Sequence, residues 1–242
     1  MGAMDDAVTR LDVPGTYNFR EVAPGALTPG LLYRSDALHR LNRAGRRRIR
    51  ELGIGEVIDL RSVFDRRVGG RDRLRGTGAV RLSIPIDGAP RRRTDLSGIT
   101  ISDVYRIILS RHQQVLGRVI REIAAADGPV LVHCTAGKDR TGLVVALTLS
   151  ALEIDRDIIL ADYAATAANL AGEWTQRMVG KARRFRVHLT DDLLVILGSS
   201  PPEVLAGALD GIDREYGGIG EYLTGAGVDA AVRAALRKKL LG

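Results

Sequence analysis

The ten residues 133–142, with the sequence HCTAGKDRTG, combine the side chains that covalent phosphoryl transfer requires. Cys134 is followed six positions later by Arg140, with a glycine between them. Backbone N–H groups in such a loop can surround three oxygens of a phosphate group, and a following helix directs its positive end to the same place. The guanidinium of Arg140 can bind two of these oxygens. The predicted phosphate-binding residues are Thr135, Ala136, Gly137, Lys138, Asp139 and Arg140.

The same positive environment predicts that Cys134 is the nucleophile. Free N–H donors and Arg140 stabilise the thiolate relative to the thiol, so we expect a lowered pKa for Cys134 and attack by the thiolate on phosphorus. Thr141 is expected to donate its hydroxyl to the sulfur and to help it leave a cysteinyl-phosphate. His133 is expected to orient the loop by hydrogen bonding to nearby backbone rather than to act as a base. Gly137 permits the tight curvature of the loop.

A leaving alkoxide or phenolate needs a proton, and two carboxyl groups are candidates for its donor. Asp87 follows a predicted strand, so it should lie at the edge of a parallel sheet where the phosphate loop also begins. Asp139 lies inside the loop and could instead be a charge neighbour of Lys138. We favour Asp87 as the acid and keep Asp139 as the alternative.

Other aspartates near short arginine-containing motifs are expected to have structural roles, because paired charges are the commoner state of such groups when buried. Their expected partners are Arg20, Arg34 or Arg61. These aspartates are Asp36, Asp59 and Asp65.

Apolar periodicity predicts the elements that position the loop. Residues 129–133 form an apolar run that is typical of a buried central strand. Residues 142–153 are apolar almost all round, as in a helix that packs on several sides. Further strands are predicted over 31–34, 56–60 and 79–86. Helices are predicted over 42–52, 157–169, 173–185, 201–216 and 229–241, and either one long helix or two shorter ones over 102–126. We therefore predict an α/β fold with a central, mostly parallel sheet flanked by helices and a helical C-terminal portion.

Two arginine- and glycine-rich segments, 62–78 and 87–100, are predicted to be loops that form mobile walls of the site. The second segment carries Arg91, Arg92 and Arg93, which could border the mouth of the site. The run 46–48 lies on a predicted helix and is expected to be a solvated face.

The composition agrees with one domain over residues 1–242, with a flexible segment at 1–13. The chain has 45% apolar and 27% charged residues, and its longest apolar run is roughly half the ~20 residues that a membrane span needs. Cys134 is the only cysteine, which excludes a disulfide framework. The net charge of +7 comes from 36 basic residues, of which 32 are arginines, against 29 acidic ones. An anionic partner would explain this surplus, but we favour arginines spread over the whole surface by compositional bias.

Several partners and cofactors are not expected. Nothing in the motifs calls for a metal or another cofactor, and 4% aromatic residues with no basic–aromatic motif argue against nucleic-acid binding. Residues 1–10 lack an apolar stretch of signal-peptide length, which predicts a cytoplasmic protein and leaves export without such a signal open.

The loop resembles the active-site loop of cysteine-dependent protein tyrosine phosphatases, and its GKDR string is similar to a bacterial subgroup of that family. Weaker resemblances lie in Asn18-Phe19-Arg20, Tyr33-Arg34-Ser35-Asp36, Asp59-Leu60-Arg61-Ser62 and the stretch from Tyr216 to Leu223. The resemblance implies a phosphatase-like fold and inorganic phosphate as a product. It also implies a phosphotyrosine protein as substrate, and in some members phosphoserine, phosphothreonine or a phosphoinositide.

The resemblance bears on the acid and on the pocket as well. Members of the subgroup have their proposed acid after the strand that here precedes Asp87. The segment with Arg91–Arg93 is shorter than in members that close a two-helix lid, which implies a more open pocket. Lys138 adds a cation that suits a substrate with several anionic groups, such as an inositol phosphate; a solvated loop lysine is the alternative.

Three function classes agree with these observations: a phosphatase, a catalytically weak phosphate- or lipid-head-group-binding module, and a thiol redox or sulfur-transfer protein. The complete set of Cys134, Arg140 and Thr141 favours the first class over the second. The third class lacks a resolving cysteine and does not explain Arg140.

Overall fold

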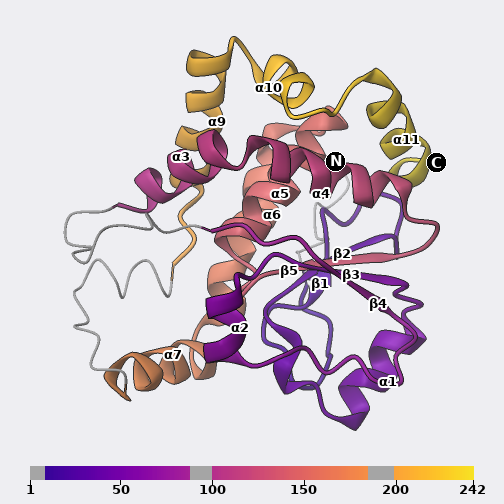
Figure 1. Cartoon of the computed structure of the whole chain (residues 1–242), viewed down its shortest axis with the longest axis vertical. Coiled ribbons are helices and arrows are strands. Elements are labelled where there is room, and N and C mark those ends of the chain that lie inside the picture. Colours follow the sequence, from indigo (N-terminus) through magenta and orange to yellow (C-terminus); the bar gives the residue numbers. More distant parts are fainter. Residues whose placement is uncertain (1–8, 88–99, 185–198) are drawn as a thin grey trace, which may run out of the picture.

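Five short strands form one sheet in the order β1-β2-β5-β3-β4 in a computed structural model, which describes residues 9–87, 100–184 and 199–242 (Figure 1). β1 pairs antiparallel with β2, and the other neighbouring strands are parallel. β5 is therefore the central strand, and its C-terminal end lies at the edge where β2 and β3 also end. The strands are β1 (Arg20–Glu21), β2 (Leu32–Ser35), β3 (Glu56–Asp59), β4 (Val80–Ser83) and β5 (Val130–His133).

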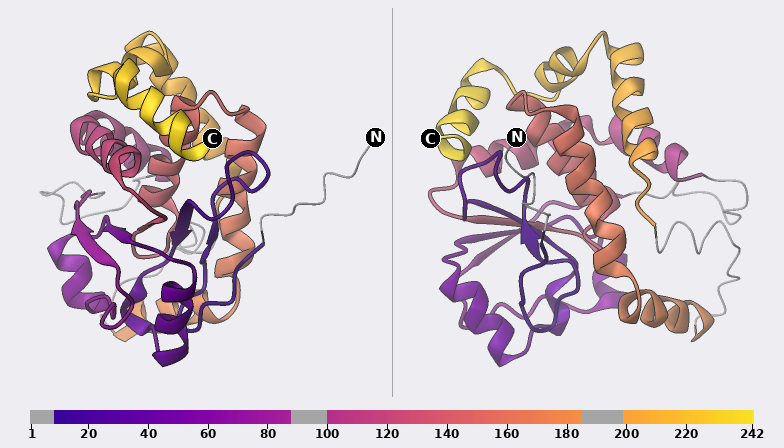
Figure 2. Two further views of the ribbon diagram at one scale, coloured as in Figure 1. Left: turned by 90° about the vertical axis from the view of Figure 1, so that its right-hand side faces the viewer. Right: turned by 180° about the vertical axis from the view of Figure 1, so that it is seen from behind.

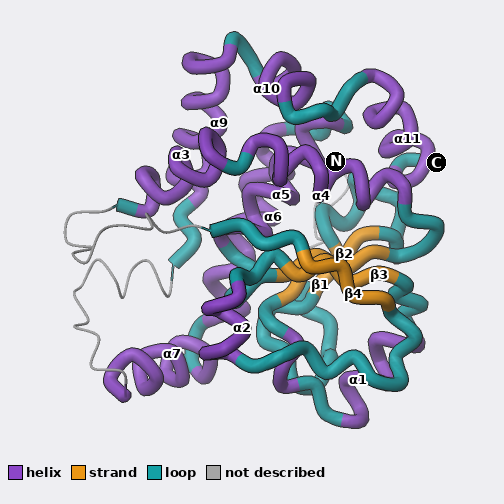
Figure 3. The backbone as a smooth tube through the Cα atoms, viewed as in Figure 1, coloured by secondary structure: helices purple, strands orange, loops and turns teal. Residues whose placement is uncertain are grey.

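Helices cover both faces of the sheet, as the tube in Figure 3 shows. One face is covered by α1 (Arg43–Glu51), whereas helices that follow β4 in the chain form a layer on the other. This layer contains α3 (Ile101–Arg111), α4 (Gln113–Ala125), α5 (Asp139–Ala151), α6 (Arg156–Leu170), α9 (Pro202–Tyr216), α10 (Ile219–Gly225) and α11 (Ala230–Leu240). Figure 2 shows α6 running from this layer towards α7 (Glu173–Arg184). In the part of the chain that the structure describes, no helix is long and apolar enough to cross a membrane.

The neighbouring strands β5 and β3 are apolar on both sides because each side packs in a different core. In β5, Val130 and Val132 belong to the large core beneath the helical layer, whereas Leu131 belongs to the smaller core beneath α1. β3 alternates in the same way between Val57 and Ile58. A strand covered on both faces needs apolar side chains at successive positions, which explains the uninterrupted apolar run before Cys134.

The predicted α/β fold with a mostly parallel sheet and a helical C-terminal portion is confirmed. Residues 102–126 form two helices, which are separated at His112. α5 begins at Asp139, three residues before the predicted start, so the end of the phosphate loop forms its first turn. Within the segment 1–13, Leu11 donates its backbone N–H to Phe19, and Val13 is buried.

The prediction of a loop over 62–78 was wrong in part, because α2 (Val63–Gly69) occupies its start (Figure 1). Ser62 caps this helix: its hydroxyl accepts the backbone N–H of Asp65, and the Asp65 carboxylate accepts that of Ser62. This reciprocal pair satisfies two of the donors at the helix start. In the other predicted loop, residues 88–99, which include Arg91–Arg93, lie outside the described residues.

The predicted aspartate partners of Arg20 and Arg34 were also wrong. Both arginines are fully buried, and both pair with Asp162 of α6, which approaches from the helical layer. Asp36 instead accepts backbone N–H groups of Tyr17 and Asn18, at 2.8 and 2.9 Å. The third prediction is confirmed, because Asp59 pairs with Arg61 at 2.9 Å.

Removal of the Asp162 carboxylate should therefore destabilise the fold strongly. We expect Asp162→Ala to lower the free energy of unfolding by about 3–5 kcal/mol, because it leaves two buried guanidinium groups without a counter-charge. The matched control is Asp210→Ala, which removes an exposed ion pair with Arg156 and should cost less than about 1 kcal/mol. Urea unfolding followed by circular dichroism measures both changes. Similar losses for the two variants would contradict the role of Asp162.

Candidate active site

The loop between β5 and α5 makes a turn that only glycine fits at its centre. Gly137 has φ +68°, in the left-handed region, and a Cβ there would lie 2.3 Å from the carbonyl oxygen of Ser35. Any other residue would have to push β2 away from the loop. The close approach of the two segments therefore depends on Gly137.

The carbonyl groups of this loop are bound by its scaffold. Arg34 donates to the carbonyl of Gly137 at 2.7 Å, and the side chain of Asn18 donates to that of Ala136 at 3.0 Å. The backbone N–H of Ala37 donates to the carbonyl of Thr135 at 3.2 Å. The backbone N–H groups of the same three loop residues make no hydrogen bond within the described part of the chain. These donors are therefore available to an oxyanion.

Cys134 lies at the base of this loop and is buried, with 2% of its surface exposed. Burial raises the pKa of its thiol, but the charge of Arg140 and the neighbouring Thr141 lower it more, so that the pKa falls below its ordinary value. The Thr141 hydroxyl is buried and makes no hydrogen bond among the described residues. The site thus favours a thiolate at Cys134, whereas the hydrogen bond expected from Thr141 to its sulfur stays a prediction.

Arg140 is held in place by three acceptors around the loop. It donates to the Asp65 carboxylate at 2.5 Å, to the Thr135 hydroxyl at 3.2 Å and to the carbonyl of Ile86 at 3.4 Å. The pKa of Asp65 is lowered: burial raises it, but Arg140 and the hydrogen bonds from Ser62 outweigh burial. Sequence reasoning missed this contact and expected Asp65 to pair with another arginine. The capping motif that begins at Ser62 was the available signal for α2, but nothing in it points to Arg140.

Both candidate acids lie near Arg140. Asp87, Asp139, Asp65 and Arg140 line one hollow of about 680 Å³, the remaining walls of which are mostly apolar. Asp139 accepts a hydrogen bond from Tyr105 at 3.0 Å, and the Lys138 ammonium lies 3.5 Å from the same oxygen. The structure therefore brings together the loop and both predicted acids at one edge of the sheet.

Lys138 differs from a solvated loop lysine. Its side chain is 3% exposed, and its ammonium donates to the carbonyl of Ser199 at 2.9 Å. The side chain thus connects the phosphate loop to the segment that precedes α9.

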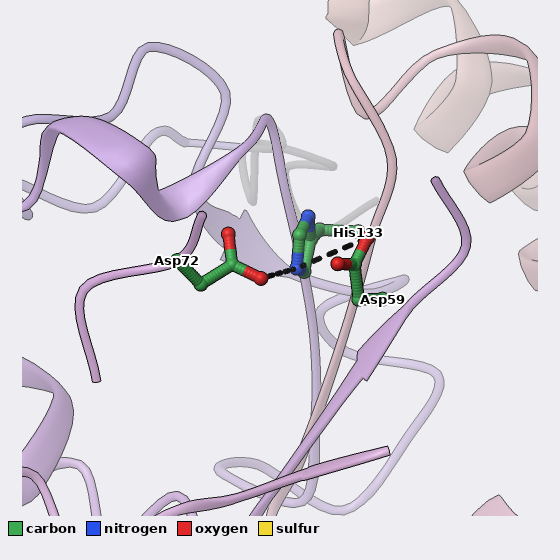
Figure 4. Close-up of side chains that lie close together, drawn as sticks. All are labelled: Asp59, Asp72 and His133. Atoms are coloured by element: carbon green, nitrogen blue, oxygen red, sulfur yellow. Dashed lines mark ion pairs between the residues drawn. The ribbon is translucent and has the colours of Figure 1, made fainter. Parts of the chain in front are cut away.

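His133 occupies a buried network of charges behind the nucleophile. Figure 4 shows its ring between the carboxylates of Asp72 and Asp59, and its Nε2 atom lies 3.2 Å from Asp72. The Nδ1 atom faces the carbonyl oxygen of Cys134 at 3.2 Å, which confirms the predicted contact with backbone. Burial lowers the pKa of His133, but Asp72 and Asp59 raise it more, so the net shift is upward. Both ring nitrogens therefore lie near oxygen atoms of the surrounding network.

Asp59, Asp72 and His133 also have the spacing of metal ligands, with ligand atoms within 4.8 Å of one another. Both carboxylates are already bound by guanidinium groups. Arg61 contacts Asp59 at 2.9 Å and Asp72 at 2.7 Å, and Arg81 contacts Asp59 at 2.9 Å. We therefore interpret the cluster as an ion-pair network that fixes His133.

A second hollow, of about 480 Å³, opens beside the phosphate loop between α2 and α7. Thr135 and Asp65 lie on its wall, so it adjoins the site of Arg140. Its cationic lining residues are Arg40, Arg61, Arg177, Lys181 and Arg184. This side of the site can accept anionic groups beyond one phosphate.

Comparison with known proteins shows which family the chain resembles in sequence. A model of the tyrosine phosphatase family matches residues 11–242. The triple specificity protein phosphatase PtpB of Mycobacterium tuberculosis is 35% identical over 280 aligned positions, which cover 96% of this chain and 99% of PtpB. A putative tyrosine-protein phosphatase of Cupriavidus necator is 28% identical over 203 positions, which cover 80% of this chain and 73% of that protein. Among solved structures, TpbA of P. aeruginosa aligns with a TM-score of 0.45 and 20% identity, over 81% of this chain and 99% of TpbA.

The titration of Cys134 should depend on Arg140. Alkylation by iodoacetamide, measured against pH, should show a midpoint below the value of roughly 8.5 for an ordinary thiol. Arg140→Met should move the midpoint upward, because it removes the largest charge that stabilises the thiolate. Arg111→Met, in an exposed position on α3, serves as the control and should leave the midpoint unchanged. An unchanged midpoint in Arg140→Met would exclude this source of thiolate stabilisation.

Proposed function

The chain belongs to the tyrosine phosphatase family, and on that premise we propose that it hydrolyses phosphotyrosine in proteins through a cysteinyl-phosphate at Cys134. One observation supports this most directly. A buried thiol with a lowered pKa lies at the base of a loop whose N–H groups and Arg140 are arranged to receive phosphate oxygens. A site for binding alone would not need the nucleophile.

In the first step, the Cys134 thiolate attacks phosphorus and the bond between phosphorus and the leaving oxygen breaks. The loop N–H groups and Arg140 stabilise the charge on the three remaining phosphate oxygens. Asp87 donates its proton to the leaving phenolate, which departs as tyrosine. The phosphoryl group is then bound to the Cys134 sulfur.

In the second step, water attacks the cysteinyl-phosphate, and the Asp87 carboxylate accepts a proton from that water. The bond between sulfur and phosphorus breaks, and inorganic phosphate is released. The sulfur leaves as a thiolate, which the Thr141 hydroxyl stabilises. This step regenerates the protonated acid and the nucleophile for the next cycle.

We assign the acid to Asp87 rather than to Asp139. The Asp139 carboxylate is held by Tyr105 and lies beside Lys138, so its surroundings favour a fixed structural carboxylate. Asp87 lies on the wall of the hollow that contains Arg140, and its backbone carbonyl is held by His112 at 2.9 Å. That hydrogen bond restrains the backbone from which the Asp87 carboxyl extends.

The hollow beside Arg140 supports an aromatic substrate. Its apolar walls are formed by residues of α2, the segment before Asp87, and α3, and could pack against a phenyl ring. These residues are Val63, Phe64, Pro85, Val104 and Ile108. The cationic hollow on the other side suits substrates with additional anionic groups, so phosphoserine, phosphothreonine and phosphoinositides belong in the test.

We also propose that the enzyme works in a reducing compartment such as the cytoplasm. The proposed chemistry requires Cys134 as a free thiolate, and oxidation of that sulfur would block the attack on phosphorus. With a single cysteine, the chain has no second thiol to reduce Cys134 through an internal disulfide.

The nucleophile can be tested directly. Cys134→Ser should abolish hydrolysis of an aryl phosphate, because the hydroxyl is not ionised near neutral pH, while phosphate binding should persist. Phosphate release and isothermal titration with a phosphotyrosine peptide measure the two properties. The same panel should include phosphoserine and phosphothreonine peptides and phosphoinositides. Full turnover by Cys134→Ser would exclude the mechanism, and binding without turnover by the wild-type chain would indicate a binding module.

The acid has a different signature in the dependence of kcat on pH. Because the acid must be protonated in the first step, kcat should fall as the pH rises above its pKa. Asp87→Asn should lower kcat and remove this fall, whereas Asp139→Asn should retain it. If Asp139→Asn removed the fall and Asp87→Asn retained it, the role would pass to Asp139.

A further inference from the structure

The positive charge of the chain is concentrated in one segment. Residues 43–81 contain 12 arginines and five acidic residues, a net charge of +7, which equals the net charge of the whole chain. The other residues are therefore neutral on balance. This corrects the prediction that the arginine surplus is spread over the whole surface.

Many of these arginines have no counter-charge in the described part of the chain. Seven guanidinium groups of this segment make neither an ion pair nor a hydrogen bond with the residues that the structure describes. Some line a hollow beside α2, together with Val63, and others line a hollow along α1. The seven are Arg43, Arg46, Arg50, Arg67, Arg71, Arg73 and Arg75.

Exposed apolar side chains gather in the same region. Phe64 is 73% exposed, Val80 61%, Val63 58% and Val68 36%. Among the described residues, only one other large apolar side chain is exposed, that of Leu241. Three of the four lie on α2, and the fourth lies on the edge strand β4. They are therefore clustered, whereas exposed apolar residues on a protein surface are normally scattered singly.

The two sides of α2 have different partners. Asp65 binds Arg140, and Arg66 donates to the hydroxyl of Ser83 at 3.1 Å, so this side attaches the helix to the protein. The other side carries Val63, Phe64, Arg67 and Val68, all of them exposed. The exposed side is therefore fixed beside the entrance to the active site.

We propose that this basic-apolar surface, made of Val68, Val80 and the seven arginines, with Val63 and Phe64 where it borders the active-site hollow, docks on an anionic phospholipid bilayer. Isolated apolar side chains that stand out from a surface can enter the boundary between head groups and acyl chains, while flanking arginines bind lipid phosphates. Both hollows contain guanidinium groups that make no ion pair with another described residue. These groups can bind the phosphates of a bilayer, whose lipids move laterally. The docked enzyme presents its active site to phosphate monoesters at the membrane, whether on proteins or on lipids.

This interaction goes beyond the proposed hydrolysis and does not require it, so the test measures binding alone. The full chain is sedimented with vesicles of phosphatidylcholine, with and without phosphatidylserine, at low and high salt. We expect binding to the vesicles that contain phosphatidylserine, and we expect salt to weaken it. Arg67→Gln and Arg71→Gln should each lower the partition coefficient about fivefold.

The apolar component has its own variants and controls. Val68→Ser combined with Val80→Ser should also weaken binding to the anionic vesicles, at both salt concentrations. Arg111→Gln and Leu241→Ser alter an exposed arginine and an exposed apolar residue outside the surface, and they should bind as the wild type does. Thermal unfolding confirms that each variant is folded.

Three results would overturn the proposal. These are no binding to anionic vesicles, equal binding to neutral and anionic vesicles, and unchanged binding in the arginine variants. If vesicle binding were absent and Arg67→Gln raised KM for an acidic phosphopeptide, the surface would belong to a protein partner instead.

Discussion

The phosphate loop can offer its backbone N–H groups to an anion only if other groups bind its carbonyls, and much of the structure serves this requirement. Arg34 and Asn18 donate to carbonyls on the buried side of the loop, and Gly137 permits their close approach. Buried donors without acceptors, or acceptors without donors, would each cost about 1–3 kcal/mol. The burial of Arg34 in turn requires a buried counter-charge, which α6 supplies as Asp162. The conformation of the loop around Gly137 thus explains why β2 contains a buried arginine, Arg34, and α6 a buried aspartate, Asp162.

The charges behind the loop do more than hold it in place. Arg20 and Arg34 share one carboxylate, so this cluster has a net positive charge; burial and the neighbouring Arg34 lower the pKa of Arg20 to about 9 despite Asp162. This arginine cluster lies in surroundings where charges are poorly screened. It therefore adds to the positive potential at the loop, which Arg34 contacts only through a backbone carbonyl.

The sequence was sufficient to predict the parts of the site that are local in the chain. The strand before Cys134 and the helix after it have distinct apolar patterns, and the loop between them carries its chemistry within eight residues. The partners of that loop could not be predicted, because Asp162 lies 128 positions from Arg34 and Asp65 lies 75 positions from Arg140. A local sequence pattern cannot predict a contact between residues so far apart in the chain. α2 was missed because its outer face is apolar and its inner face is charged, the reverse of the pattern by which a helix on a core is recognised.

The contact between Asp65 and Arg140 has a cost for an enzyme that binds a phosphate dianion, because the carboxylate competes for the guanidinium. An unrestrained arginine, however, would lose about 2 kcal/mol of side-chain entropy when it bound the phosphate. Asp65 and Thr135 bind the Arg140 guanidinium from two sides, so this entropy is lost when the protein folds rather than when phosphate binds. The guanidinium therefore stays beside the loop. Electrostatic stabilisation of a transition state depends on such groups being in place before the reaction. The capped helix α2 holds Asp65, so a short surface helix that packs little apolar area is nevertheless fixed by the charge of the active site.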